Sequence, residues 1–208
     1  MRIAVVGSGG HAKVVADAVL AQGHELFGFF DEDASRWSET VLGYPILGSI
    51  KGWQHHSIDA LVVGIGDNLA RKVVFNQLKI AGAKLTTLVH PRATLGKGVA
   101  LGEGVVVLTN VVVNSDSQIE PNCILNTACT VDHDCVVGAH AHLAPGVNIT
   151  GRVRLGEGTF VGTGAKIIPG IRVGDWAIVG AGAVVIRNVD GGAKVVGVPA
   201  KPIKRSPP

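Results

Sequence analysis

The sequence predicts a half-Rossmann-like α/β domain followed by an all-β domain, a parallel β-helix of hexapeptide repeats. Two patterns predict this combination. Residues 2–32 read as strand, glycine turn, helix, strand and acid, whereas residues 95–185 carry a branched aliphatic residue at every sixth position. The composition agrees with the second pattern: 29 of the 208 residues are glycine and only 4% are aromatic, which suits a solenoid better than a layered globule.

The six-residue period is unbroken. An α-helix would need apolar residues near every 3.6 positions, and an ordinary strand would need strict alternation. A period of six fits short strands joined by tight corners, with glycine after the aliphatic residue relieving the backbone there. Strands of successive coils then stack in parallel around a narrow core. The repeated residues are Leu95, Leu101, Val107, Val113, Ile119, Leu125, Val131, Val137, Leu143, Ile149, Leu155, Val161, Ile167, Val173, Val179 and Val185.

A second inward column lies four places after each aliphatic residue and holds small or β-branched residues. The three cysteines, Cys123, Cys129 and Cys135, all fall in this column. We expect them to be reduced, buried space-fillers, because successive hexads lie on different sides of a coil and their side chains do not converge.

The first domain is expected to alternate strands and helices. Val15, Val19 and Leu20 should lie on the buried side of its first helix. Proline at position 91 disfavours helix in the residue before it and marks the end of the domain. The predicted domains are 1–90, 91–190 and a tail, 191–208. The predicted elements are strands at 2–6, 25–30, 59–65 and 85–89, helices at about 12–22 and 69–81, and a variable loop at 37–53.

The turn after the first strand has the glycine spacing of phosphate-binding loops. Residues 7–12 (GSGGHA) fit G-x-G-x-x-G/A, and Asp31 and Glu32 follow about 20 residues later. Glycine lets backbone N–H groups at a helix N-terminus approach a phosphate. Gly66 ends the third predicted strand, again where open α/β sheets bind ligands. A tight turn without a ligand would carry the same glycines, and the short domain leaves room for one nucleotide only.

Candidate catalytic residues lie in the middle of the repeat. His133, His140 and His142 stand outside both inward columns, so we expect them to point outward. Histidine titrates near neutrality and can accept a proton from an attacking amine. The neighbouring carboxylates of Asp132 and Asp134 could orient such a base. A backbone N–H or His142 could stabilise the oxyanion that forms.

Several stretches, spread over the whole chain, resemble bacterial nucleotide-sugar N-acetyltransferases, a left-handed β-helix family closely similar to the sialic acid O-acetyltransferases. The resemblance implies three hexads per coil, a little over five coils, a homotrimer and an active site between adjacent subunits. The matching stretches are VGSGGH at 6–11, FDE at 30–32, GIGDN at 64–68, VHP at 89–91, Asn126-Thr127, HDC at 133–135, HLAPG at 142–146 and VGVPAK at 196–201.

The resemblance also implies roles for individual residues. His133 would be the general base and Asp134 would raise its basicity. The acetyl-CoA site would include His142, Thr163 and Ala181. The residues expected to bind the nucleotide-linked sugar are Gly9, Gly10, His11, Asp31, Glu32 and Gly66, with Asn126 as a further sugar contact.

The favoured function is therefore acetyl transfer from acetyl-CoA to the amine of a nucleotide-linked 4-amino-4,6-dideoxy sugar. Alternatives are a sialic acid O-acetyltransferase, a metal-dependent enzyme resembling γ-type carbonic anhydrases with His133, His140 and His142 as ligands, and a non-catalytic assembly module. No metal is expected for the favoured function. The net charge of +3 disfavours nucleic acid as a partner, and no stretch is apolar enough to span a membrane, so a cytoplasmic location is expected. The nucleotide (UDP, GDP or dTDP) stays open.

Overall fold

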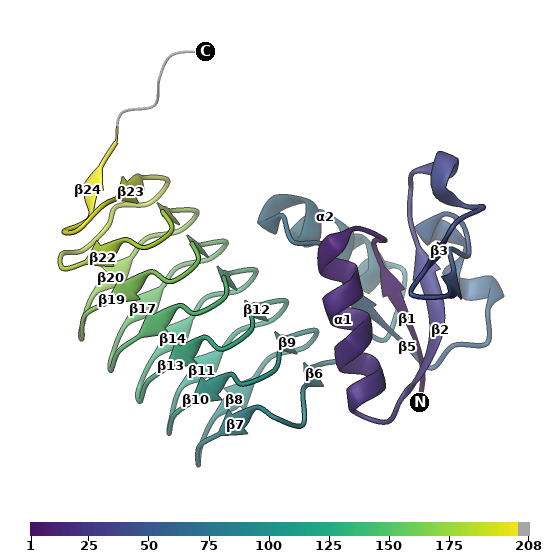
Figure 1. Cartoon of the computed structure of the whole chain (residues 1–208), viewed down its shortest axis with the longest axis horizontal. Helices are drawn as coiled ribbons and strands as arrows, with labels where there is room; N and C mark the ends of the chain where they lie inside the picture. The colour runs from purple at the N-terminus through teal and green to yellow at the C-terminus, as the bar shows by residue number, and fades with distance from the viewer. Residues whose placement is uncertain (204–208) are drawn as a thin grey trace. The chain divides into compact units, whose positions relative to one another are not determined.

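The computed structural model describes residues 1–203, which form two compact units divided between Pro91 and Arg92 (Figure 1). The last five residues of the predicted tail lie outside the described range. Within residues 1–203, no helix has the length and apolar character needed to cross a lipid bilayer.

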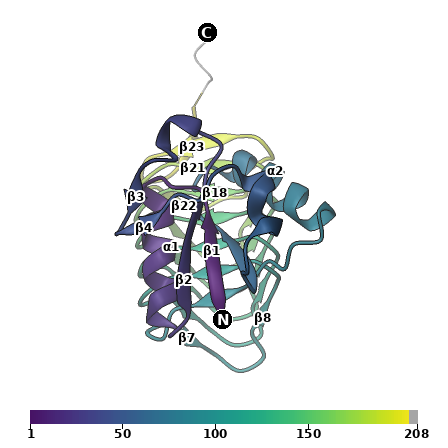
Figure 2. The ribbon, with the colours of Figure 1, turned by 90° about the vertical axis from the view of Figure 1, so that its right-hand side faces the viewer.

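The first unit is a three-stranded parallel sheet with two helices. The strands are β1 (Arg2–Val6), β2 (Glu25–Phe30) and β5 (Ala60–Val63), in the order β2-β1-β5. Helix α1 (Gly10–Ala21) connects β1 to β2, and helix α2 (Asn68–Ile80) follows β5. Figure 2 shows β1 and β2 side by side. The carboxyl ends of β1 and β2 therefore lie next to each other, and the carboxyl end of β5 lies on the other side of β1.

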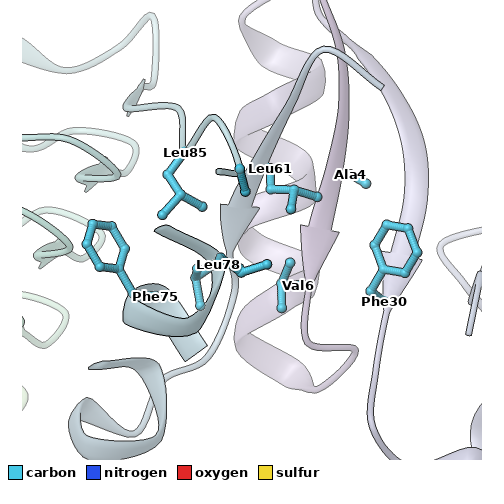
Figure 3. Close-up of a cluster of buried hydrophobic side chains, with 9 residues drawn as sticks. Ala4, Val6, Phe30, Leu61, Phe75, Leu78 and Leu85 are labelled. Carbon is cyan, nitrogen blue, oxygen red and sulfur yellow. The ribbon is translucent and has the colours of Figure 1, made fainter. Parts of the chain in front are cut away.

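Helix α2 and the chain after it complete the core of this unit. Figure 3 shows Phe75 and Leu78 of α2 with Leu61 of β5 and Val6 of β1, all at most 4% exposed. Burying a side chain of this size contributes about 1.5–3 kcal/mol. Phe75 and Leu78 therefore form the buried side of α2, whereas Leu69, Val73 and Ile80 of the same helix are exposed.

The predicted elements of this unit need three corrections. Helix α1 begins two residues earlier than predicted, at Gly10, and Leu20 is 38% exposed, so it does not belong to the buried side. The predicted fourth strand at 85–89 is wrong for this sheet: Leu85 makes one isolated parallel bridge, to Leu61, and only Leu88–Val89 (β6) is a strand. The third predicted strand is real but shorter, Ala60–Val63.

The variable loop contains structure that the sequence did not reveal. A short antiparallel hairpin pairs β3 (Thr40–Val41) with β4 (Tyr44–Pro45), and two 3₁₀ helices, η1 (Ala34–Arg36) and η2 (Ile50–His55), flank it. Elements of two to six residues are too short to show a period, which is why a propensity argument missed them.

The second unit is a β-helix, and the fold-class prediction is confirmed. Strand partners lie 18 residues apart, as in Val113 opposite Val131, so each coil takes three hexads. All sixteen inward aliphatic residues occupy the second position of a two-residue strand. The strands are β7 (Thr94–Leu95), β8 (Ala100–Leu101), β9 (Val106–Val107), β10 (Val112–Val113), β11 (Gln118–Ile119), β12 (Ile124–Leu125), β13 (Thr130–Val131), β14 (Val136–Val137), β15 (His142–Leu143), β16 (Asn148–Ile149), β17 (Arg154–Leu155), β18 (Phe160–Val161), β19 (Lys166–Ile167), β20 (Arg172–Val173), β21 (Ile178–Val179) and β22 (Val184–Val185).

These strands form three parallel sheets. Sheet 1 holds β7, β10, β13, β16, β19 and β22, and sheet 2 holds β8, β11, β14, β17 and β20. Sheet 3 runs from β9 through β12, β15, β18 and β21 to β23 (Lys194–Val196), on which β24 (Lys201–Pro202) pairs antiparallel. The chain turns at three corners per coil, named here corner 1–2, corner 2–3 and corner 3–1 after the sheets they join.

Glycine serves two purposes at these corners. Relief of the backbone at the turn, which the sequence suggested for the glycine after the aliphatic residue, applies to another position of the hexad. The positive-φ residue stands three places after the inward aliphatic residue and is often asparagine, aspartate or glycine. The glycine directly after the aliphatic residue has another cause. A Cβ on Gly138 would come within 2.7 Å of the Gly156 carbonyl carbon and 2.8 Å of the Glu157 nitrogen. These glycines are therefore needed because backbones of successive coils approach closely, and not because they relieve the turn.

The cysteine prediction is confirmed. Cys123, Cys129 and Cys135 are buried thiols outside any disulfide, in the second inward column. Burial raises the pKa of Cys129 to about 12 and also raises the pKa of Cys135, so both are neutral thiols at pH 7.

Candidate functional site

A cavity of about 440 Å³ opens at the carboxyl ends of β1, β2 and β5. Six predicted substrate-binding residues line it, although they come from three separate stretches of the first unit. Parallel strands bring those stretches together, because their carboxyl ends meet at one edge of the sheet. The six are Gly9, Gly10, His11, Asp31, Glu32 and Gly66.

The glycines in and opposite this loop have distinct roles. Gly7 has φ +98°, a conformation that residues with a Cβ rarely adopt. A Cβ on Gly64 would lie 2.7 Å from Val5 Cγ1 and 3.0 Å from Ala12 Cα, so this glycine lets α1 pack on the sheet. Gly9 and Gly10, in contrast, face open space. No side chain caps the N-terminus of α1, which leaves its first N–H groups suited to an anion.

Asp31 holds the glycine loop in place. Its Oδ2 accepts hydrogen bonds from the backbone N of Ser8, at 2.8 Å, and from Ser8 Oγ, while its Oδ1 accepts from Asp33 N at 3.0 Å. Arg36 completes the network by donating from Nη1 to Ser8 Oγ at 2.6 Å. Burial would raise the pKa of Asp31, but the hydrogen bonds from Ser8 and Asp33 and the charge of Arg36 together lower it. Asp31 is therefore ionised and organises the loop.

Glu32 orders a different segment. Its Oε1 accepts from Ser49 Oγ at 3.0 Å and from Ile50 N at 3.1 Å, where η2 begins. A second cavity, of about 590 Å³, adjoins the first, and both are lined by Glu32, Ile50 and Val74. Trp53, Gln54 and Gln77 line the second cavity, and no motif or period in the sequence marked them.

His11 lines the first cavity as a neutral ring. Burial, together with the nearby positive charge of Arg71, lowers the pKa of His11 from 6.5 to about 4. At neutral pH this histidine therefore offers hydrogen bonds and no charge to a ligand in the cavity.

In the second unit, His133 and Asp134 form a pair at corner 1–2. Nδ1 of His133 lies 2.7 Å from Oδ2 of Asp134. Since the carboxylate can only accept, Nδ1 carries the proton and Nε2 is left with a lone pair. Asp132 lies farther, with Oδ2 4.0 Å from Nε2, and its Oδ1 accepts from the backbone of His133. The side chain of His133 is 47% exposed, so it points outward as predicted.

Gly151, which sequence reasoning missed, lies on the next coil against the same ring. A Cβ at this position would come within 2.6 Å of Nε2 and 2.7 Å of Cε1 of His133. The separation of 18 residues could have signalled this contact, because one coil takes three hexads.

His142 and Asn126 meet at a different place, where sheet 3 leads into corner 3–1. Nε2 of His142 lies 3.2 Å from Nδ2 of Asn126, and the ring packs edge-on against Phe160 at 5.3 Å between centroids. His142 is only 7% exposed, as is His140 at corner 2–3, so these two side chains are buried although they stand outside both inward columns. Stacked neighbours cover His142, because Ile124 and Phe160 flank it in sheet 3.

Thr163 and Ala181 also lie at corner 3–1, one coil apart, and both are exposed. Their column passes through Thr127, so the predicted coenzyme residues share one edge of the β-helix. His133 lies at another corner of the same subunit, one side of the triangle away. At about 3.3 Å per residue, six residues span roughly 15–20 Å. One subunit alone therefore does not bring the predicted base to the predicted coenzyme edge.

The metal-dependent alternative fits this arrangement poorly. His133, His140 and His142 lie respectively at corner 1–2, at corner 2–3 and in sheet 3. Among residues 1–203, no cluster of three or more histidine, cysteine or acidic side chains is arranged to hold a metal ion.

Comparison with known families identifies both units. Residues 2–78 match the PglD N-terminal domain, and residues 152–187 match the bacterial transferase hexapeptide, a family of six repeats. The chain is thus an α/β domain joined to a hexapeptide-repeat transferase domain.

Solved structures match nearly the whole chain. A point mutant of perosamine N-acetyltransferase from Caulobacter crescentus, in complex with CoA and GDP-perosamine, has 38% sequence identity and a TM-score of 0.94, over 99% of this chain and 98% of that one. The acetyltransferase domain of PglB from Neisseria gonorrhoeae has 36% identity and a TM-score of 0.90, over 97% and 99%. WeeI from Acinetobacter baumannii has 29% identity and a TM-score of 0.90, over 98% and 100%.

The fold is that of a hexapeptide-repeat acyltransferase. The chain belongs to the family of nucleotide-sugar N-acetyltransferases that includes these relatives. The predicted family and enzyme class are thereby confirmed.

Proposed function

We propose that this protein transfers the acetyl group of acetyl-CoA to the amine of a nucleotide-linked 4-amino-4,6-dideoxy sugar. Family membership supports the reaction class. The observation that carries the mechanism is the 2.7 Å contact between His133 Nδ1 and Asp134 Oδ2, because it leaves Nε2 as the basic atom. The relative from Caulobacter crescentus was crystallised with CoA and GDP-perosamine, which supports an acceptor of this chemical class.

In the proposed reaction, His133 Nε2 accepts a proton from the sugar amine as the amine nitrogen attacks the thioester carbonyl. The carbonyl oxygen becomes an oxyanion in a tetrahedral intermediate. Collapse of this intermediate restores the carbonyl, forms the amide and breaks the C–S bond. The leaving CoA thiolate takes up the proton that His133 received, so the base is regenerated. Asp134 orients the ring and stabilises its charged form.

The nucleotide part of the acceptor would bind in the first unit. The open N–H groups of α1 near Gly9 and Gly10 suit a diphosphate, and the adjoining cavity beside Trp53 suits an aromatic base. We place Thr163 and Ala181 on the coenzyme edge with His142. Since acetyl-CoA is made in the cytoplasm, we propose that the reaction occurs there.

We propose that the active site forms between two copies of the chain, in a homotrimer, since His133 and the coenzyme edge lie at different corners of one copy. Subunit mixing tests this. His133→Asn and His142→Ala should each be inactive alone, but co-expressed chains should recover activity, because some sites then combine an intact His133 with an intact His142. Mixed oligomers without activity would contradict a shared site.

Binding tests the nucleotide assignment. Calorimetric titration with GDP, UDP and dTDP should show one tight diphosphate, and CoA should bind without competing with it. A protein that bound CoA and sialic acid but no nucleotide diphosphate would favour sialic acid O-acetylation. A protein that bound neither CoA nor a nucleotide would support the non-catalytic assembly module.

A further inference from the structure

We infer that Asn126 is a positioning residue that fixes His142 as the neutral Nδ1–H tautomer, so that His142 acts as a hydrogen-bond donor and not as a second base. The role of the donor, which is to hold the acyl oxygen, rests on the proposed function. The tautomer does not rest on it, because it follows from contacts within one subunit.

The orientation of the Asn126 amide is determined by the backbone. Its Oδ1 accepts a hydrogen bond from Thr127 N at 2.8 Å. A backbone N–H can only donate, so the oxygen must face Thr127 and the NH₂ group must face the other way. That NH₂ group lies 3.2 Å from Nε2 of His142.

An NH₂ group can only donate, so Nε2 of His142 must accept. In a neutral imidazole with Nε2 as acceptor, the proton is on Nδ1. A doubly protonated ring, with N–H on both nitrogens, could not accept this bond. The Thr127 N–H group thus determines, through the orientation of the Asn126 amide, which nitrogen of His142 carries the proton.

Packing keeps the ring in this contact. His142 is 7% exposed and lies edge-on to Phe160, with an interplanar angle of 88°. Its strand pairs with β12 on one side and β18 on the other. Because Asn126 follows β12 directly, the amide and the ring are set by the same strand pairing.

The two histidines assigned to the reaction therefore hold the same Nδ1–H tautomer but leave different nitrogens available for the reaction. Asp134 accepts from Nδ1 of His133 and leaves a basic Nε2, whereas Asn126 donates to Nε2 of His142 and leaves an Nδ1–H. A base and an oxyanion donor need this difference, because the base must take a proton while the donor must keep one.

Nitrogen NMR of the full-length protein labelled with ¹⁵N-histidine tests the tautomer. Long-range ¹H–¹⁵N correlations distinguish the two neutral tautomers, and a His142→Gln variant identifies the signals. The expected result is an Nδ1–H pattern in the wild type and its loss in Asn126→Asp, whose carboxylate accepts where the amide donated. An Nε2–H pattern in the wild type, or an unchanged pattern in Asn126→Asp, would overturn the inference.

Steady-state kinetics test the consequence. Asn126→Asp should lower kcat about 100-fold, the usual effect of losing an oxyanion donor, with a small change in the KM for the amino sugar. Asn122→Asp is the matched control, because Asn122 contacts His140 at 2.7 Å in another Asn–His pair. It should leave the His142 signals unchanged and kcat within about two-fold, since it lies outside the network.

The alternative outcomes are distinct. If Asn126 only contacts the sugar, the KM rises, kcat holds and the His142 pattern stays the same, which contradicts the inference. If the wild type shows the Nδ1–H pattern but transfers no acetyl group to any amino sugar, the proposed function fails while the tautomer stands.

Discussion

Gly151 lies against the ring of His133, one coil away, so closely that a Cβ would come within 2.6 Å of Nε2. The atom crowded by such a substitution is the one proposed to accept the proton. His133 is otherwise held by Asp134 at Nδ1, and the ring could yield only by moving away from its position.

Gly151→Ala should therefore lower kcat by about 10- to 100-fold, the effect expected from displacing a reacting group by about 1 Å. The coil should stay folded, because Gly151 is not among the positive-φ residues. Gly191→Ala is the control, since its nearest atom, Asp175 O, lies at 3.3 Å. Steady-state thiol release with a melting curve checks both; an alanine variant with the kcat of the wild type would contradict the assigned role.

Substitution of the base and substitution of its carboxylate partner should lower kcat by different amounts. His133→Asn should lower kcat by about 100- to 10,000-fold, as loss of a general base does. Asp134→Asn should cost less, because its amide oxygen can still accept from Nδ1 while the charge is lost. Asparagine is the suitable replacement, since residue 134 has φ 59° and asparagine tolerates this conformation. Equal losses in both variants would argue against separate roles.

The two kinds of glycine in the β-helix should differ in stability. Gly170→Ala, at φ +77° with open space around it, should cost about 1–2 kcal/mol of backbone strain. Gly138→Ala should cost more, about 3 kcal/mol or above, because its Cβ would meet the backbone of the next coil and the coils must separate. Urea unfolding of both variants measures this order, and a reversed order would contradict the stacking explanation.

Asp31 should affect nucleotide binding through the loop. Asp31→Ala removes the acceptor for Ser8 N and Ser8 Oγ, so the loop loses its fixed shape and the best-bound nucleotide should lose about 10-fold in affinity, or about 1.4 kcal/mol. CoA binding should be unchanged. Glu25→Ala, which breaks an exposed pair with Arg2, serves as the control. Calorimetry that finds equal nucleotide affinity in all three proteins would remove Asp31 from this role.

His11 should make folding sensitive to mild acid. Its pKa is about 4 in the folded protein and about 6.5 when unfolded, so the unfolded chain binds more protons between these values. Stability is then lost as the pH falls from about 6.5 to about 4, by about 2–3 kcal/mol from this residue. Between about pH 7 and pH 4.5, the free energy of unfolding of His11→Gln should fall by about 2–3 kcal/mol less than that of the wild type, as measured by urea unfolding. Parallel losses in both proteins would contradict the assignment.

The β-helix was predictable because one pattern determines it. Each inward aliphatic residue, from Leu95 to Val185, occupies the same position in its strand, and a fixed period leaves one way to stack the coils. The strand at 85–89 was not predictable in the same way, because an apolar run does not reveal whether a strand finds a neighbour. Leu85 makes one bridge only.

The residues that line the first cavity were predictable from the sequence, but their contacts were not. The motif pointed to Asp31 as a ligand residue, yet Asp31 instead accepts hydrogen bonds from Ser8, which lies 23 residues earlier in the sequence. Arg36, which no motif marked, also donates to Ser8. His142 stands outside both inward columns, but neighbouring strands bury it. Side-chain packing between coils decides such exposure, and the hexad gives only the direction of the side chain.

The most direct measurement follows acetyl transfer itself. Wild-type protein and His133→Asn are each incubated with acetyl-CoA and nucleotide-linked 4-amino-4,6-dideoxy sugars, with sialic acid beside them, while thiol release and product mass are recorded. We expect an acetylated amine on one nucleotide sugar with the wild type, a loss of turnover in the variant, and no product from sialic acid. Acetylation of sialic acid alone, or undiminished turnover without His133, would contradict the proposed function.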